Sequence, residues 1–152
     1  MADILHRVGI KSSLDEVYQA LTTLDGLAAW WTNTTQGEST VGGTLRFRFS
    51  DPGGVEIGGF DMKILELQPP RHVRWQVADG PEEWIGTKID WGLKQDGGYV
   101  IALFKHLDWK EPTEFMHHCS TKWATFLMSL KSFVETGQGA PSPHDVKIDN
   151  WN

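Results

Sequence analysis

The sequence predicts an α+β fold in which a curved antiparallel β-sheet wraps around one long C-terminal α-helix. Three observations support this prediction. The chain has 152 residues, which suits one domain with a single substantial core. Apolar and polar residues alternate between residues 44 and 107, which is typical of half-buried strands. From residue 113 the apolar period becomes helical, and the resulting stripe runs to a glycine-rich stop.

The first part of the chain predicts one strand and two short helices. Residues 4–10 alternate well enough for a strand. A helix follows over residues 11–22, where Ser12 or Ser13 can serve as the N-cap because a hydroxyl accepts from the free N–H groups of the first turn. Residues 24–32, with the sequence LDGLAAWWT, predict a second short helix.

The middle of the chain predicts a meander of strands joined by short turns. Each segment alternates apolar and polar residues and is bounded by a turn signal such as DPGG or QDGG. Connections this short favour antiparallel pairing of neighbours. The predicted strands are residues 44–49, 59–67, 73–77, 84–94 and 99–107.

Two ways of counting disagree in the last of these strands. Counting back from Trp109 places His106 on one face with Phe104, whereas counting forward from Gly98 groups Tyr99 with its alternate neighbours. A bulge near Phe104 reconciles the counts. The direction of the His106 side chain stays open.

A helix over about residues 113–136 closes the predicted fold. Its apolar side chains occupy about a third of the circumference, with Gly137 as the expected C-cap. Leu130 lies in the middle of this stripe, so Leu130→Ala is expected to cost about 2–5 kcal/mol. Ser129→Ala, on the predicted polar side, is expected to stay within about 0.5 kcal/mol. The polar side comprises Lys122, Thr125, Ser129 and Ser132.

The domain prediction is one domain over residues 1–140 with a tail over residues 141–152. The tail is polar but carries an apolar residue at intervals, which favours docking on the domain. The large aromatic stripe of the last helix needs an apolar surface of similar size, and the inner face of the meander is the one available. A twisted sheet is expected to curve around such a helix.

Charge and composition narrow the function classes. The net charge is −6 and no run of Lys or Arg is present, which argues against binding of nucleic acid. No segment has the apolar length to cross a bilayer, so membrane insertion is not expected. The N-terminus lacks a signal-peptide pattern and Cys119 is the one cysteine, which together predict a cytoplasmic protein.

No strong catalytic or metal motif is present. There is no Walker loop, nucleophile elbow or paired-cysteine motif. His117 and His118 precede Cys119, but neighbours on a helix share no face and a third ligand is not evident. We therefore expect a solvent-facing histidine pair beside a core thiol, with no metal and no cofactor. The charged strand residues are expected on a solvated outer face, namely Arg46, Arg48, Asp61, Lys63, Lys88 and Asp90.

Several motifs in order carry a resemblance that spans nearly the whole chain. They are AAWWT, GGTLRFRF, ILELQPPRHVRW, WIGTKIDWGL, HLDW and KWATFLMSLKSFVETGQGAP. Together they resemble the START-like (SRPBCC) superfamily, and within it the family named after the activator of the heat-shock chaperone ATPase. The resemblance implies a helix-grip fold with a cavity between the curved sheet and the last helix, and it suggests a role in stress response. In related sequences a small residue often stands where Asp108 sits.

The leading functional hypothesis is a non-enzymatic domain that binds a small hydrophobic or aromatic molecule in this cavity. So many bulky side chains on a curved surface are expected to hold the helix away from the strands, and a mostly apolar site suits such a ligand. His106 or a tryptophan N–H would orient one polar atom. The competing outcome is that the same side chains interdigitate and leave no void. The predicted site residues are Trp31, Phe47, Met62, Trp75, Trp91, His106, Trp123, Phe126 and Leu127, and Leu127→Trp is expected to abolish binding without unfolding the protein.

Two other hypotheses belong to different classes. The family name suggests a regulator whose partner is a heat-shock chaperone. Because one domain accounts for the chain, and such a regulator is expected to bring a second domain, we expect no stimulation of the chaperone ATPase by this chain alone. The other hypothesis is an enzyme of the cyclase or hydratase kind that uses His106 with Asp90. It requires both side chains to point into one cavity.

Overall fold

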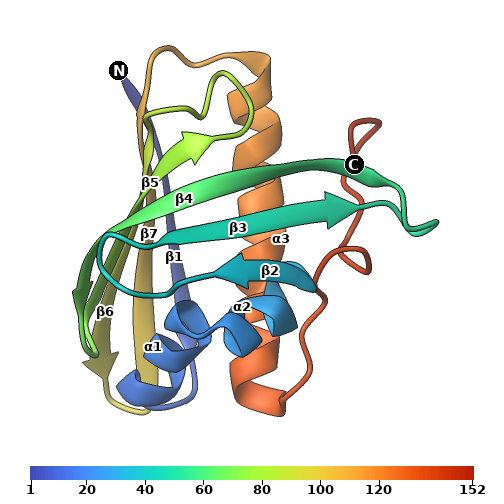
Figure 1. Cartoon of the computed structure of the whole chain (residues 1–152). Coiled ribbons are helices and arrows are strands. Elements are labelled where there is room, and N and C mark those ends of the chain that lie inside the picture. The colour runs from blue at the N-terminus through green and yellow to red at the C-terminus, as the bar shows by residue number, and fades with distance from the viewer.

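A seven-stranded antiparallel sheet curves around a long helix in the computed structural model, which describes residues 1–152 (Figure 1). The strands lie in the order β1-β7-β6-β5-β4-β3-β2. This arrangement confirms the predicted α+β helix-grip fold. The elements in chain order are β1 (Ala2–Ile10), α1 (Leu14–Thr22), α2 (Leu24–Trp30), β2 (Thr34–Gly37), β3 (Thr44–Ser50), β4 (Glu56–Gln68), β5 (His72–Asp79), β6 (Lys88–Asp96), β7 (Tyr99–Trp109) and α3 (Glu114–Thr136).

Two hydroxyl caps start the short helices. The Oγ of Ser13 accepts from the backbone N–H of Glu16 at 3.2 Å, which confirms Ser13 as the N-cap of α1. Thr23 ends α1 and caps α2 in turn, since its Oγ1 accepts from the Gly26 N–H at 3.0 Å. α1 and α2 lie at the lower end of the sheet in Figure 1, beside the last turns of α3.

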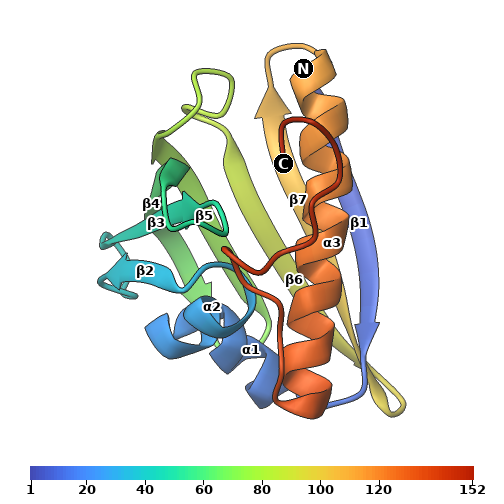
Figure 2. The same ribbon diagram turned by 90° about the vertical axis from the view of Figure 1, so that its right-hand side faces the viewer.

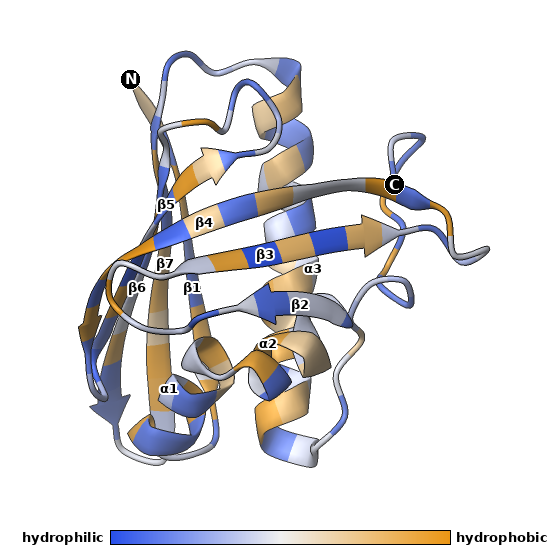
Figure 3. Cartoon of the chain, in the orientation of Figure 1, coloured by the Kyte–Doolittle hydropathy of each residue, from blue (hydrophilic) through white to orange (hydrophobic).

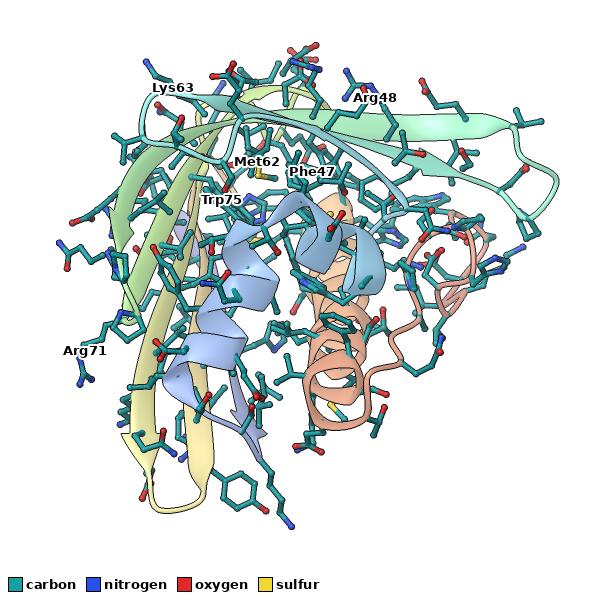
Figure 4. The ribbon with its side chains drawn as sticks, turned by 60° about the horizontal axis from the view of Figure 1, so that its bottom comes forward. Phe47, Arg48, Met62, Lys63, Arg71 and Trp75 are labelled. Carbon is teal, nitrogen blue, oxygen red and sulfur yellow. The ribbon has the colours of Figure 1, made fainter.

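Alternating side chains give the sheet one apolar and one charged face. Phe47, Met62 and Trp75 are buried and point toward the helices, whereas Arg48 and Lys63 point away (Figure 4). The same alternation appears along the strands when residues are coloured by hydropathy (Figure 3). The inner face forms the core with the helices, so the period-two pattern of the sequence has its expected physical cause.

Asp90 lies on the outer face of β6 but is not solvated as predicted. Its side chain is 5% exposed, because His72 and Arg74 of the neighbouring strand cover it. The His72 Nε2 and the Arg74 Nε each lie 2.7 Å from the Asp90 Oδ2. These contacts supply the partners that a buried carboxylate requires.

The structure corrects the sequence prediction at two places in the sheet. β2, with the sequence TTQG, was not predicted because it has no apolar alternation; backbone pairing to β3 holds it at the sheet edge. Residues 84–87 form a turn and not the start of a strand, since β6 begins at Lys88. Trp84 therefore lies in the loop that joins β5 to β6.

The direction of His106 is resolved by the register of β7. His106 points into the core with Phe104, and the β6–β7 register runs without a shift along the whole pairing. The predicted bulge near Phe104 is therefore wrong. The irregularity lies at Asp108, whose φ is 70°, where the pairing with β1 changes register. Since positive φ strains most side chains, this explains why a small residue suits the position.

α3 buries one face against the sheet and ends at Gly137. Its buried residues include Trp123, Phe126, Leu127 and Leu130, as the apolar stripe predicts. Gly137 adopts a left-handed conformation with a φ of 84° and donates its N–H to the Phe133 carbonyl at 2.7 Å. No helix of the fold has the length and apolarity needed to cross a membrane.

Ser129 is not on a solvated side of α3, contrary to the prediction. It is 6% exposed, and its Oγ donates to the Trp30 carbonyl at 2.7 Å and accepts from the Ala140 N–H at 2.7 Å. One hydroxyl thus joins α3, the end of α2 and the chain that follows α3. The helical period gave no sign of this, because the partners are distant in sequence.

Ser129→Ala is accordingly expected to lower the free energy of unfolding by about 1–3 kcal/mol, because a buried carbonyl and a partly buried N–H lose their partner. Ser132→Ala is the matched control, since the Ser132 Oγ is exposed and water can replace its bond to the Gln138 carbonyl. The control is expected to stay within about 0.5 kcal/mol. Equal midpoints for the two variants in urea unfolding would contradict the assignment.

The chain after α3 turns back along the helix (Figure 2). The Ser142 N–H donates to the Trp31 carbonyl at 2.8 Å, and the Asn33 N–H donates to the Ser142 carbonyl at 3.1 Å. Further along, the Asp145 Oδ2 lies 2.6 Å from the Lys122 Nζ, and the Asp149 Oδ2 lies 2.7 Å from the His118 Nδ1. Residues 142–152, the C-terminal segment, therefore contact both α2 and the first half of α3.

α3 also contacts the edge strand β1. The Lys131 Nζ donates to the Gly9 carbonyl at 2.5 Å, and the Glu135 Oε2 accepts from the Lys11 N–H at 2.7 Å. The Lys131 Nζ lies 2.8 Å from the same Glu135 carboxylate. These two side chains thus bond backbone groups at and just beyond the end of β1.

Candidate functional site

An apolar pocket of about 190 Å³ opens between the first half of α3 and the β3–β4 hairpin. Phe115 to Phe126 of α3 supply one wall, and residues 57–60 of β4 supply the opposite wall. The lining also includes Trp31 at the end of α2, Phe49 of β3, Trp84 of the β5–β6 loop and Trp151 of the C-terminal segment. The pocket thus combines parts of the chain that are far apart in sequence.

Aromatic rings make up most of the pocket surface. Trp84 stacks on Phe60 with 4.1 Å between the ring centroids. Trp31, at the end of α2, packs against Trp123 at 5.1 Å and against Phe126 at 6.3 Å. Such a wall offers flat apolar faces, which favour planar or hydrocarbon groups over flexible polar ones.

Three of the nine predicted site residues line the pocket, namely Trp31, Trp123 and Phe126. The other six are buried but lie outside its lining, and they are Phe47, Met62, Trp75, Trp91, His106 and Leu127. Leu127→Trp would therefore overpack the core and would not fill the pocket, so it is unsuitable as a test of binding.

His106 has a partner on each ring nitrogen. The Trp123 Nε1–H donates to the His106 Nδ1 at 3.2 Å, and the His106 Nε2 lies 2.8 Å from the Thr87 Oγ1. The Thr87 hydroxyl donates to the Trp84 carbonyl at 2.5 Å, so the His106 Nε2 carries the proton that the hydroxyl oxygen accepts. Burial lowers the pKa of His106 from 6.5 to about 3. The ring is thus a neutral bridge within the core.

The pair required by the cyclase or hydratase hypothesis is not brought together. His106 points into the core, whereas Asp90 lies on the outer face of the sheet and bonds His72 and Arg74. The two side chains do not enter one cavity, so the geometric condition for joint acid–base chemistry is not met.

The polar edge of the pocket is already paired. The Lys122 Nζ bonds Asp145 and lies 3.1 Å from the Asn152 backbone carbonyl. His118 bonds Asp149, and this bond holds the pKa of the Asp149 carboxyl below its usual value. The Trp151 ring lies 5.4 Å from the His118 ring. The His118 side chain is therefore largely covered, whereas the sequence predicted that it faces solvent.

The Cys119 thiol also lines the pocket but is chemically inert at neutral pH. Burial is the main cause that raises its pKa to about 12. Since the thiolate is the nucleophile and metal ligand of cysteine, the neutral thiol acts here as a small apolar group.

Trp84 was not predicted as a site residue, although its position relative to the period-two alternation of the strand was informative. In the segment from Trp84 to Lys94, the core residues of β6 are Ile89, Trp91 and Leu93. Trp84 is out of step with these alternate positions, which indicates that the strand does not extend back to it. A large aromatic residue in a loop beside an apolar face is a candidate for the wall of a site.

Known proteins resemble this chain in both sequence and fold. Residues 11–135 match the family model described as Activator of Hsp90 ATPase homolog 1-like protein. The solution structure of the Aha1 dimer from Colwellia psychrerythraea is 46% identical, with a TM-score of 0.78 over 91% of this chain and 100% of that chain. A comparison with curated proteins gave no match.

More distant structures share the fold alone. CalU16 from Micromonospora echinospora is 21% identical, with a TM-score of 0.70 over 93% of this chain and 77% of that chain. A protein from Staphylococcus saprophyticus is 12% identical, with a TM-score of 0.71 over 91% of this chain and 95% of that chain. Because one fold hosts many functions, these two structures leave the ligand open.

Proposed function

The chain belongs to the Activator of Hsp90 ATPase homolog 1-like family, and from this premise we propose that it binds a small hydrophobic or aromatic molecule in the pocket between α3 and the sheet. The observation that carries the proposal is the pocket itself, which is open to solvent and walled by aromatic side chains. An apolar hollow of this kind is the usual site of a small ligand.

The size of the pocket sets the expected affinity. A bicyclic compound that buries about 200 Å² of apolar surface gains about 5 kcal/mol from the hydrophobic effect. Loss of its translational and rotational freedom offsets part of this gain. We therefore expect dissociation constants of about 0.2 to 10 mM for simple bicyclic probes. A natural ligand that also uses the polar atoms of the wall would bind more tightly.

Gly58 offers a way to fill the pocket without straining the backbone. It pairs with Phe49 across the β3–β4 ladder, and directly paired residues share a face of the sheet. A Cβ built on Gly58 meets no atom within 4 Å. Gly58→Phe is thus expected to occupy the pocket and to weaken the binding of N-phenyl-1-naphthylamine at least tenfold, measured by probe fluorescence.

Gly98→Phe is the matched control. Gly98 lies in the turn between β6 and β7, outside the pocket lining, and its Cβ likewise meets no atom within 4 Å. This variant is expected to bind the probe as the wild type does. The proposal fails if Gly58→Phe and wild type bind with equal affinity, or if a broad set of aromatic probes leaves the resonances of Trp31, Trp84 and Trp123 unmoved.

A second candidate function is contact with a heat-shock chaperone. It is supported by the name of the 46% identical structure from Colwellia psychrerythraea, Aha1. The measurement is the ATPase rate of a purified chaperone of the Hsp90 class during titration with this chain. Saturable stimulation that Gly58→Phe leaves unchanged would favour this function over ligand binding. We expect no stimulation by the wild-type chain alone.

A further inference from the structure

We propose that residues 143–152 of the C-terminal segment form a gate that opens about Ser142 to admit the ligand and closes over it with the Trp151 ring. This inference rests on the proposed function and adds how access to the same pocket is controlled. Three observations support it: the segment is fixed at one point, polar side-chain contacts hold the rest, and the part held in this way is a wall of the pocket.

Ser142 is the fixed point of the segment. It is buried, and its N–H and carbonyl bond the backbone of Trp31 and Asn33. Its Oγ also accepts from the Ser50 N–H at 3.2 Å. Beyond Ser142, no backbone–backbone bond joins residues 143–152 to a helix or a strand. Side chains must therefore hold this part of the chain in place.

One lysine makes most of the contacts that hold it. The Lys122 Nζ lies 2.6 Å from the Asp145 Oδ2. The same nitrogen donates to the Val146 carbonyl at 2.5 Å and lies 3.1 Å from the Asn152 carbonyl. Since an ammonium group has three donors, these contacts occupy all of them. Lys122 thus joins the two ends of the stretch to α3.

A second contact comes from the same face of α3. His118 lies one turn before Lys122, and its Nδ1 lies 2.7 Å from the Asp149 Oδ2. Little apolar burial adds to these contacts, because Trp151, the largest side chain of the stretch, is 49% exposed. Segments with few buried apolar contacts open first in a folded protein. Residues 143–152 can therefore detach while the domain stays folded.

The stretch held in this way is one wall of the pocket. Trp151 and Asn152 line the pocket, and so do His118 and Lys122, which hold them. The Trp151 ring lies 6.4 Å from the ring of Phe115, another lining residue, and the segment follows the first half of α3 (Figure 2). Opening removes this aromatic wall and widens the entrance. A ligand that contacts the wall favours the closed form.

Cys119 can report the open form independently of ligand binding. It is the one cysteine of the chain, lines the pocket and is 4% exposed. Burial raises the pKa of its thiol to about 12, so the closed protein should react slowly with the neutral aromatic disulfide 4,4′-dithiodipyridine. In this reaction the thiolate forms a mixed disulfide with one half of the reagent and releases the other half as 4-thiopyridone, whose absorbance gives the rate.

Asp145→Asn/Asp149→Asn in the full chain weakens both ionic contacts, and neither residue lines the pocket. We expect Cys119 of this double variant to react about tenfold faster than in the wild type, because the open form becomes more populated. Asp108→Asn is the matched control, since it removes the ion pair with Lys88 outside the lining, and it should react at the wild-type rate. Urea unfolding verifies that the domain of each variant is folded.

Two further measurements complete the test. Trp151→Ala removes the ring that covers the entrance and should also accelerate the reaction of Cys119, so it serves if the double variant does not fold. Saturating 1-indanone should slow the reaction in the wild type, because the compound occupies the pocket and favours the closed form.

The inference is overturned if the double variant, or Trp151→Ala in its place, reacts at the wild-type rate. Equal acceleration in Asp108→Asn also overturns it, as does binding of 1-indanone that leaves the rate unchanged. None of these results affects the proposed function. That function fails separately if a broad set of aromatic probes, 1-indanone among them, leaves the tryptophan resonances of the pocket lining unmoved.

Discussion

Leu130→Ala is expected to lower the free energy of unfolding by about 2–5 kcal/mol. Leu130 has no exposed surface and lies in the middle of the buried face of α3. Truncation removes apolar contacts and leaves a cavity that the packed interior can only partly close. The change is measured by urea unfolding followed by tryptophan fluorescence, with the slope of the transition checked for constancy.

Met128→Ala is the matched control for this experiment. Met128 lies two residues earlier in the same helix and is 56% exposed. Its truncation removes few contacts and introduces a good helix former, so its effect is expected within about 0.5 kcal/mol. A loss of similar size in both variants would mean that α3 presents a different face to the sheet.

Acid is expected to destabilise the protein through His106 as the pH falls below about 6.5. The folded state lowers the pKa of this histidine from 6.5 to about 3, so between these values the unfolded chain binds one more proton than the folded protein does. Stability from this group is therefore complete above pH 6.5 and decreases as the pH falls. The slope is at most about 1.4 kcal/mol per pH unit.

His106→Gln isolates this contribution. The variant is expected to be less stable at pH 7, because the bonds to Trp123 and Thr87 are disturbed, but to lose less stability between pH 6.5 and pH 4.5. His144→Gln, at an exposed position, should keep the wild-type pH dependence. Urea unfolding at several pH values measures both effects. A wild-type slope that persists in His106→Gln would show that other groups cause the acid sensitivity.

Local patterns in the sequence predicted most elements of the fold correctly. Ser13 and Gly137 mark the ends of helices through conformations and hydrogen bonds that involve near neighbours, so their chemistry is readable from the sequence. Strand alternation is likewise local. β2 escaped prediction because its four polar residues carry no such signal, and its position depends on backbone bonds to β3.

The location of the pocket could not be predicted from the same patterns. The sequence places Phe47, Trp75 and Trp91 on the inner face of the sheet, and we expected the cavity there. In the structure α2 delivers two tryptophans to that region: Trp31 packs on Phe47 and Trp75, and Trp30 packs on Trp91. Side chains thus fill the space between the middle of the sheet and α3. This is the alternative stated in the sequence analysis, in which the aromatic side chains interdigitate and leave no void.

The opening remains between the β3–β4 hairpin and the first half of α3, and Trp31 at the end of α2 lines one side of it. Its walls come from the hairpin, the β5–β6 loop and the C-terminal segment as well as α3. These contacts join residues far apart in sequence, so neither the strand alternation nor the helical repeat predicts them. The same limitation explains Ser129, whose buried role depends on Trp30 and Ala140 and not on its place in the helical repeat.

The contacts between α3 and β1 affect the association of the sheet edge with other molecules. β1 is the last strand on one side of the sheet, and the unpaired backbone groups of an edge strand can recruit a strand from another molecule. Lys131 and Glu135 occupy the Gly9 carbonyl and the Lys11 N–H at the end of this edge. A second chain that tried to extend the sheet there would have to displace both side chains and bury their charges. At this end of β1, α3 therefore hinders the addition of a strand from another molecule.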